Sequence, residues 1–384
     1  MNEAYLAGCG LASGLGADLA TALAALAANG RAPERYELPG GSAWPLLTIP
    51  EPSVAAPLDD LRDRPGAADP TAGLVPHDAL VPHDAWLRRA QRIVRDVATA
   101  SGALAGPRSG PLLLASSSLN AGANADQGDF SGDYAAFADT VAEWLDWRGT
   151  VFTVSTACTS GLTALLSART LIRHGAAGSA LVLGLELRNR VTVGGFGAMQ
   201  LLSARRALPC GRGRDGLMLG EAVAALHVTR TPARWRIAGG ANVVDGRDPA
   251  GTSPDAVVGM CAAALADSGL TADAIDLIKL QAAGSPRNDA AEVRALTRVF
   301  QPLPALVSLK AVLGHTSGAA GAAEIALLTG CLERGVWPHI DYPQDTTLRA
   351  PLAPVAPPRV QHLLACILGF GGGHAAVVLA DGAA

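Results

Sequence analysis

The chain has 384 residues, of which 49% are hydrophobic and 17% charged, and its formal net charge is −4. This composition predicts a globular protein with a large core, built as two domains or one layered body, and it excludes an intrinsically disordered chain. It gives no basic surface for nucleic acid and no basic stripe for a lipid surface. No uncharged apolar run of about 18 residues predicts a membrane span.

The cysteines and lysines narrow the possible chemistry. The six cysteines form no C-x-x-C pair, which predicts reduced thiols rather than disulfides or a zinc site. The first twenty residues lack a basic region and contain Glu3 and Asp18, which predicts no signal peptide and a cytoplasmic location. Arginine supplies nearly all the positive charge, since Lys279 and Lys310 are the only lysines in the sequence.

Strand-like and helix-like segments alternate along the chain. Residues 4–16 are typical of a strand and a glycine-rich turn, and residues 17–30 of a helix that ends at Gly30. Five further helices are predicted, over residues 85–102, 159–175, 255–270, 288–300 and 318–335. Further strands are predicted over residues 110–118, 150–158, 179–186, 220–230, 275–284 and 305–311, with two more within 361–381. Residues 120–150 are expected to be irregular or partly helical. The alternation occurs twice and predicts two α/β halves with mostly parallel sheets.

Two local patterns point to other functions but carry weak signals. Gly8 and Gly10 form a G-x-G, but the next glycine is at position 14 rather than 13, so we discard a dinucleotide-binding oxidoreductase. The hexapeptide LVPHDA occurs twice in residues 74–85 and duplicates His77 and His83. Replication slippage in a loop explains this repeat better than a metal site, because its prolines argue against a regular element.

Three segments at predicted strand ends carry groups that catalysis uses. Cys158 lies between a strand and a helix, where a helix N-terminus favours a thiolate; the alternative is a small core residue. His315 follows a strand and a glycine, five residues after Lys310, and is either functional or structural. The glycine turn within 368–379 either supplies backbone N–H groups to an oxyanion hole or is a tight hairpin.

Together these segments resemble the β-ketoacyl synthase family, the condensing enzymes of fatty acid and polyketide assembly. The motifs that carry the resemblance span nearly the whole chain in order: LAGCGLASGLGADLATALAALAANG, TACTSG, LLSARRALPCGRGRDGLMLGEAVA, AAGSPRNDAAE, KAVLGHTSGAAGAAE and LGFGGGHAAVVL. The resemblance implies the thiolase fold, an α/β fold in which two similar halves pack as a layered αβαβα body. The expected halves are 1–235, carrying Cys158, and 236–384, carrying Gln281, His315 and the glycine turn.

The resemblance also implies the roles of the reacting groups. Cys158 would take an acyl chain from a carrier protein as a thioester, and its own N–H and that of Phe370 would hold the oxyanion. Phe370, followed by Gly371 in the glycine turn, would gate the pocket. His315 would polarise the malonyl carbonyl during decarboxylation.

Four further residues would support that chemistry. Lys310 and Glu324 would set the electrostatics around the histidine, and Asp289 and Glu292 would belong to the polar support network. The resemblance implies no metal and no organic cofactor, because the phosphopantetheine of an acyl carrier protein brings the substrates.

Three positions depart from the family's pattern. The usual His-Gly-Thr-Gly-Thr is replaced by residues 281–285, so Gln281 stands where the family has its first catalytic histidine. An amide donates hydrogen bonds but carries no positive charge and takes up no proton. The usual Thr-Asn of the glycine turn is Gly373-His374, and an Asp expected shortly before Arg-Asp-Gly is Gly211.

Two hypotheses follow from these observations. The first is a β-ketoacyl-[acyl carrier protein] synthase, an acyltransferase that condenses carrier-bound acyl and malonyl thioesters with a Cys158, Gln281 and His315 site. The second is a subunit like the chain length factors of type II polyketide and aryl polyene systems, weakly or not catalytic, which shapes the pocket of a partner synthase. Either hypothesis implies an acyl carrier protein as partner and a homodimer or a heterodimer with a related ketosynthase.

The TVFTV strand before Cys158 has two interpretations. It is either the sheet edge that pairs in this dimer or an interior strand.

Overall fold

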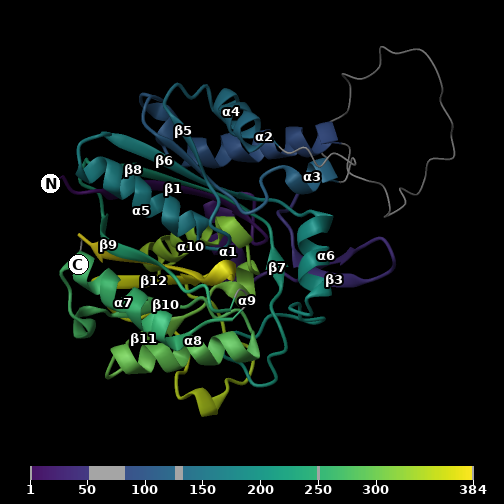
Figure 1. The fold of residues 1–384 in the computed structure, drawn as a ribbon, viewed down its shortest axis with the longest axis vertical. Coiled ribbons are helices and arrows are strands. Elements are labelled where there is room, and N and C mark those ends of the chain that lie inside the picture. Colours follow the sequence, from purple (N-terminus) through teal and green to yellow (C-terminus); the bar gives the residue numbers. More distant parts are fainter. Residues whose placement is uncertain (1, 52–82, 126–132, 249–250, 383–384) are drawn as a thin grey trace.

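A computed structural model describes residues 2–51, 83–125, 133–248 and 251–382 of the chain. Its main sheet has the strand order β11-β10-β12-β13-β9-β1-β8-β6-β4-β5 (Figure 1). These strands are β1 (Tyr5–Ser13), β4 (Leu112–Ala115), β5 (Val151–Val154), β6 (Ser179–Glu186), β8 (Ala222–Thr229), β9 (Trp235–Val244), β10 (Leu277–Lys279), β11 (Ala305–Val307), β12 (His362–Leu368) and β13 (Gly373–Asp381). A smaller sheet joins β2 (Glu34–Glu37), β3 (Ala43–Leu47) and β7 (Leu219–Gly220).

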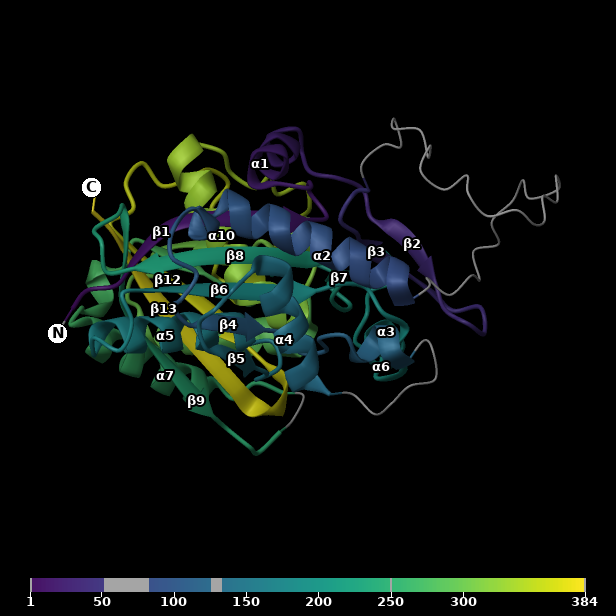
Figure 2. The ribbon, with the colours of Figure 1, turned by 90° about the horizontal axis from the view of Figure 1, so that it is seen from above.

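Helices cover both faces of the main sheet and fill the space between its halves (Figure 2). The α-helices of the described residues are α1 (Leu19–Ala27), α2 (His83–Ala100), α3 (Ala121–Ala125), α4 (Tyr134–Leu145), α5 (Ser160–Arg173), α6 (Arg190–Ala198), α7 (Pro254–Ser268), α8 (Pro286–Val299), α9 (Lys310–Leu313) and α10 (Ala320–Arg334), of which α3 and α6 lie beyond the end of the main sheet (Figure 2). None of the helices described by the structure is long and apolar enough to cross a membrane.

Successive side chains of each strand point into different cores, and this alternation creates the layers. On β6, Val182 joins a core shared with α5 and α10, whereas Leu181 and Leu183 join a core shared with α2 and α4. On β13, Val377 faces the same inner core and Val378 faces α7 and α8. The expected layered αβαβα body is therefore confirmed.

The two halves of the sheet meet along a short ladder. Tyr5 and Leu6 of β1 pair with Arg236 and Trp235 at the start of β9, so that both halves form one continuous sheet. The boundary between 1–235 and 236–384 as separate units stays a prediction.

The expectation of mostly parallel sheets is wrong, because the sheet is mixed. β4 pairs in parallel with β5 and β6, and β10 with β11 and β12, but the central strands β8, β1, β9 and β13 pair antiparallel. For one further antiparallel pair, β12 and β13, the physical reason is the connection, a tight glycine turn that returns the chain antiparallel.

Smaller corrections concern the ends of elements. The strand predicted over 305–311 ends at Val307, and Lys310 begins the short helix α9 instead. The helix α6 is absent from the sequence-based expectations, because three glycines weaken its helix-forming pattern. The hexapeptide repeat lies largely outside the described residues, and α2 begins at His83 within its second copy.

The strand before Cys158 lies at an edge of the main sheet. β5 is the last strand in the sheet order, and Phe152 in it is 43% exposed. The alternative of an interior strand is therefore wrong, and the free side of β5 is open to pairing.

Gly8 and Gly10 serve helix packing. A Cβ on Gly10 would lie 2.0 Å from the carbonyl oxygen of Val97 in α2, and a Cβ on Gly8 would lie 2.5 Å from that of Ser101. Glycine at these positions lets α2 approach the backbone of β1 directly.

We expect Gly10→Ala to lower the free energy of unfolding by about 2–3 kcal/mol, because the added methyl meets backbone that cannot rotate away. Gly259→Ala on α7 is the matched control. A Cβ there meets nothing within 4 Å, and alanine favours a helix over glycine by up to about 1 kcal/mol. Urea unfolding of both variants measures the difference, and equal midpoints would contradict the packing role of Gly10.

Candidate active site

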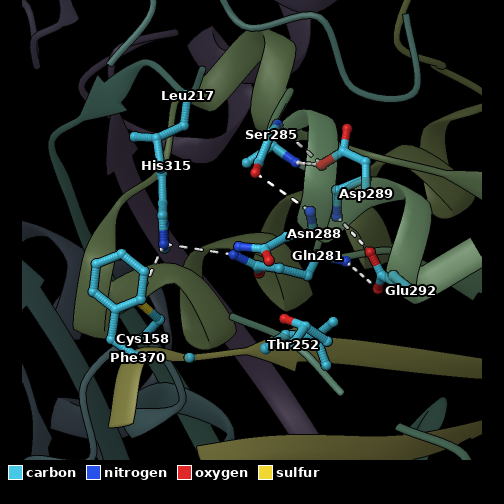
Figure 3. Close-up of a pocket in the computed structure, with 14 residues that line it drawn as sticks. Cys158, Leu217, Thr252, Gln281, Ser285, Asn288, Asp289, Glu292, His315 and Phe370 are labelled. Atoms are coloured by element: carbon cyan, nitrogen blue, oxygen red, sulfur yellow. Dashed lines mark hydrogen bonds between the residues drawn. The ribbon is translucent and has the colours of Figure 1, made fainter. Parts of the chain in front are cut away.

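The predicted site residues come together where strands of both halves end (Figure 3). Cys158 follows β5, Gln281 follows β10, and Phe370 follows β12, while His315 lies between α9 and α10. A pocket of about 40 Å³ is lined by these four side chains. Strand ends of α/β sheets are where such folds place ligand sites.

A strained turn presents Cys158 at the start of α5. Ala157 has φ +51°, a left-handed conformation that alanine rarely adopts. The turn is tied by hydrogen bonds from the Thr156 N–H to Ser160 Oγ at 2.9 Å and from Ser160 Oγ to the Ala157 carbonyl at 2.6 Å. This geometry aims the thiol into the pocket, where Cys158 is only 5% exposed.

Two glycines bring the helix of Cys158 against the helix that follows His315. A Cβ on Gly161 of α5 would lie 2.6 Å from the backbone N of Ala322, and one on Gly321 of α10 would lie 2.5 Å from that of Leu162. Because neither position tolerates a side chain, α5 and α10 cross in backbone contact. The crossing holds the start of α5 beside the chain segment that carries His315.

His315 links the two halves of the site. Its Nε2 lies 3.2 Å from Cys158 Sγ and 3.5 Å from Gln281 Nε2, and its Nδ1 lies 3.5 Å from Lys310 Nζ. An ammonium group only donates, so Nδ1 accepts and the ring proton is on Nε2, facing Cys158. Burial first, and then the charges of Lys310 and Lys279, hold the pKa of His315 well below its usual value. The imidazole is therefore a neutral hydrogen-bond donor.

Both lysines of the chain bind Glu324. Lys310 Nζ donates to one carboxylate oxygen of Glu324 and Lys279 Nζ to the other, and all three side chains are at most 1% exposed. Sequence reasoning assigned Lys310 and Glu324 but no role to Lys279. The sequence did carry a signal for Lys279, because only two of its 30 basic residues are lysines and Lys279 is one of them.

Removing the charge of Lys310 should raise the pKa of His315. Lys310→Met keeps the side-chain length and deletes the nearest cation, whereas Lys279→Met deletes a cation with a smaller influence on the same ring. The fraction of charged His315 at pH 6 should therefore grow in the order wild type, Lys279→Met, Lys310→Met. NMR titration of ring protons, with His315→Gln for assignment, measures it. An unchanged or lower pKa in Lys310→Met would contradict this arrangement.

Two buried carboxylates fix the backbone around Gln281. Glu292 accepts from the N–H groups of Gln281 at 2.7 Å and Ala282 at 2.8 Å. Asp289 accepts from four further N–H groups, those of Cys210, Ala283, Gly284 and Ser285, at 2.9 to 3.1 Å. Burial raises the pKa of Asp289 to about 6 and that of Glu292 to about 7. Both residues line the pocket, but the hydrogen bonds of their carboxylates go to backbone N–H groups, mostly those of residues 281–285.

The Gln281 amide remains available to a ligand. Its Oε1 is buried and has no hydrogen-bond partner among the described residues, and its Nε2 faces His315. A half-turn of the amide exchanges the two atoms, which lets Oε1 accept from His315 Nε2–H or Nε2 donate into the pocket.

The glycine turn lies against the start of α5. Burial raises the pKa of the Cys158 thiol, and the backbone N–H groups of Phe370 and Cys158 and the charge of Lys310 oppose that effect. Gly371 and Gly372 have φ +77° and +76°, and a Cβ on Gly372 would lie 1.7 Å from the Asp245 carbonyl oxygen. The turn therefore holds the Phe370 N–H beside the thiol, next to the N–H of Cys158 itself, and such a pair of donors stabilises an oxyanion on an attached carbonyl.

Gly211 and His374, the other positions at which the sequence analysis predicts a departure from the family's pattern, are both placed by packing. A Cβ on Gly211 would lie 2.9 Å from the Tyr342 ring, so the glycine lets Tyr342 pack there and donate to the Pro209 carbonyl at 3.0 Å. His374 is 1% exposed, and burial lowers its pKa.

The described residues contain no group of three or more His, Cys, Asp or Glu side chains placed to hold a metal ion. The groups that do converge are a thiol, a neutral imidazole, an amide and two backbone N–H donors. Such a set forms a thioester, holds its oxyanion, and donates hydrogen bonds to a second carbonyl.

Two family models match the chain and together cover more than half of it. "Beta-ketoacyl synthase, N-terminal domain" matches residues 91–233, and "Beta-ketoacyl synthase, C-terminal domain" matches residues 236–341. Among curated proteins, the chain is 30% identical over 258 residues to the tetracenomycin polyketide synthase ketoacyl synthase alpha subunit of Streptomyces glaucescens, covering 61% of this chain and 60% of that protein. It is 28% identical over 205 residues to 3-oxoacyl-[acyl-carrier-protein] synthase 2 of Coxiella burnetii, covering 47% and 49%.

The aligned part spans less than two thirds of these relatives and only 8% of a lovastatin diketide synthase of Monascus pilosus.

Solved structures match over nearly the whole chain. A ketosynthase in complex with its chain length factor from Xenorhabdus doucetiae aligns with a TM-score of 0.78 and 22% identity, covering 99% of this chain and 98% of that one. A beta-ketoacyl synthase from Burkholderia phymatum aligns with a TM-score of 0.77 and 21% identity, covering 99% and 100%. At these identities the structures establish the thiolase fold.

Proposed function

Since the chain belongs to the β-ketoacyl synthase family, we propose that it condenses carrier-bound acyl and malonyl thioesters through Cys158. The observation that carries this proposal is the meeting of the Cys158 thiol with His315 Nε2 at 3.2 Å, beside the N–H groups of Phe370 and Cys158. A core cysteine would need none of these partners.

The first step loads the acyl chain. The Cys158 sulfur attacks the carbonyl of an acyl-carrier thioester, and the N–H groups of Cys158 and Phe370 bind the oxyanion that forms. The carbon–sulfur bond to the carrier breaks, and the carrier thiol leaves with the proton that Cys158 loses. His315 keeps its own proton on Nε2 throughout.

The second step uses the donors on the other side of the pocket. His315 Nε2–H and the Gln281 amide hydrogen-bond the malonyl thioester carbonyl as CO₂ leaves. The carbanion attacks the acyl carbonyl on Cys158, the carrier takes away the β-ketoacyl product, and the released thiolate takes a proton. Lys310 and Lys279 favour the negative charge that develops on the malonyl oxygen.

The partners follow from the same proposal. An acyl carrier protein would deliver both substrates, and no metal or organic cofactor takes part. The free edge of β5 would pair with a second copy or a related ketosynthase, as two partially exposed β-branched or aromatic side chains, Phe152 and Val154, favour strand pairing. One solved relative is a ketosynthase in complex with its chain length factor.

The second candidate function is that of a chain-length-factor-like subunit. The observation that favours it is Gln281, because one imidazole and one amide stabilise the developing charge less than two histidines. In that case the protein would shape the pocket of a partner synthase and have weak or no condensing activity of its own.

A product assay separates the two. Purified protein is incubated with an acyl-carrier and a malonyl-carrier thioester in three arms: alone, with an intact candidate partner ketosynthase, and with that partner after its own cysteine is replaced by alanine. A β-ketoacyl-carrier product detected by mass spectrometry supports the condensing enzyme. Product that appears only with an intact partner cysteine would support the subunit role instead.

A further inference from the structure

Glu324 holds two buried ammonium groups, one more than its charge balances. One carboxylate oxygen accepts from Lys310 Nζ and the other from Lys279 Nζ, and the three side chains are at most 1% exposed. These three side chains, the Glu324 cluster, therefore have a net positive charge in a part of the fold that is shielded from water. A buried charge without a counter-charge lowers the free energy of unfolding.

The two carboxylates that fix the Gln281 backbone do not remove this excess. Burial raises the pKa of Glu292 to about 7, so about half of this carboxyl group is protonated at neutral pH. The carboxylate of Asp289 accepts from four backbone N–H groups and lies in the field of Arg214. Charge balance therefore does not explain the second ammonium group of the Glu324 cluster.

Lys279 and Gln281 lie on the same face of one chain segment. Ile278 of β10 and Leu280, which follows the strand, both pack in the core beneath α7 and α8. Because successive side chains of a strand alternate, Lys279 and Gln281 turn to the opposite side. Gln281 Nε2 lies there, 3.5 Å from His315 Nε2 (Figure 3). Lys279 therefore belongs to the side of the site that carries the amide.

The two lysines differ in what they reach. Lys310 Nζ lies 3.5 Å from His315 Nδ1, and the same ring contacts Cys158 Sγ through Nε2. Burial raises the pKa of Cys158, and among charged groups Lys310 opposes this rise, whereas Lys279 is not among the main influences on that thiol. Both lysines, after burial, lower the pKa of His315. Lys310 thus acts on the thiol and on the imidazole, and Lys279 acts on the imidazole alone.

We propose that Lys279 is a positioning residue for the second step alone. Its charge, unbalanced at Glu324, favours the negative charge that develops on the malonyl oxygen, next to an amide that carries no positive charge of its own. The fold keeps this charge at a cost in stability, as functional sites often do. The inference rests on the proposed condensation and separates the roles of the two lysines, of which Lys310 serves both steps.

The first measurement separates a functional charge from a structural ion pair. Lys279→Met leaves Glu324 balanced by Lys310, and the matched control Lys310→Met leaves it balanced by Lys279. The excess charge is gone in either variant, so Lys279→Met should unfold at a urea concentration equal to or above that of wild type. A lower midpoint would show that Lys279 stabilises the fold and would overturn the inference.

The second measurement follows the two steps at pH 8, above the ordinary pKa of histidine, so that His315 stays neutral in every variant. A unit charge roughly 10 Å from a developing oxyanion is worth about tenfold in rate at the effective dielectric of protein sites. Lys279→Met should therefore release CO₂ from a malonyl-carrier thioester about tenfold more slowly than wild type, and should load an acyl chain at the wild-type rate. Lys279→Gln, which keeps an N–H donor without the charge, should behave like Lys279→Met. Lys310→Met should slow both steps.

The outcomes separate this inference from the proposed function. An active wild type with equal CO₂ release in Lys279→Met, or with an equal loss of acyl loading in that variant, would overturn the inference and leave the proposed function standing. Full CO₂ release in Lys279→Gln would assign the effect to a hydrogen bond and would also overturn it. A wild type that neither loads an acyl chain nor releases CO₂ would overturn the proposed function and, with it, this role of Lys279.

Discussion

Cys158→Ala should abolish the acyl adduct that wild type forms with an acyl-carrier thioester. The sulfur is the group that meets both oxyanion donors and His315, and no other thiol of the described chain lies in this pocket. Loss of a nucleophile costs far more than loss of one donor, so the rate of transacylation should fall by more than about 10³-fold. Intact mass spectrometry after incubation shows the adduct directly.

Cys9→Ala provides the matched control. Burial raises the pKa of Cys9 to about 12, so its thiol stays protonated and inert, and its variant should form the adduct like wild type. An adduct that persists in Cys158→Ala would mean another nucleophile. Absence of the adduct in wild type would contradict the condensing-enzyme proposal and leave the supporting subunit as the remaining function.

Much of the fold follows from local pattern. The helix beginning after Asp18, the strand over 179–186 and the strands around the glycine turn match the sequence expectation closely, because each has an unbroken apolar period and a clear boundary residue. The order of strands does not follow from local pattern. The antiparallel centre depends on which strands meet across hundreds of residues, and the alternation of strands and helices alone suggested parallel pairing.

In the site, too, local sequence predicts the single residues but not how they meet. The resemblance placed Cys158 and His315 in one pocket, but 157 positions separate them, and nothing local predicts their 3.2 Å contact. The contact depends on the glycine crossing of α5 and α10. Lys279 was overlooked because its strand reads as an ordinary buried one, and a lone charge in such a strand has no local partner. Glu186 at the end of β6 likewise accepts hydrogen bonds from the hydroxyls of Ser116, Ser117 and Ser118 after β4, and only the order of strands in the sheet brings these residues together.

Gln281→His should raise the rate of malonyl-carrier decarboxylation by about 10²-fold. The substitution introduces the imidazole that the sequence resemblance leads us to expect at this position, next to His315 and close to the charges of Lys310 and Lys279. One well-placed donor to a developing oxyanion is worth ~10²–10³ in rate, and an amide whose atoms can exchange by a half-turn holds that donor less firmly than a ring. Release of CO₂ from malonyl-carrier thioester measures the rate.

The control makes the same chemical change where no substrate reaches. Gln361 is exposed, so Gln361→His should leave decarboxylation at the wild-type rate. A Gln281→His rate equal to that of Gln361→His would show that Gln281 is not what limits the second step. We would then place the limit in the glycine turn at Gly373 and His374, where the sequence resemblance leads us to expect Thr-Asn. A rise confined to Gln281→His would instead mean that the fold, the thiol and the oxyanion donors already suffice, and that a single amide separates this site from a full condensing site.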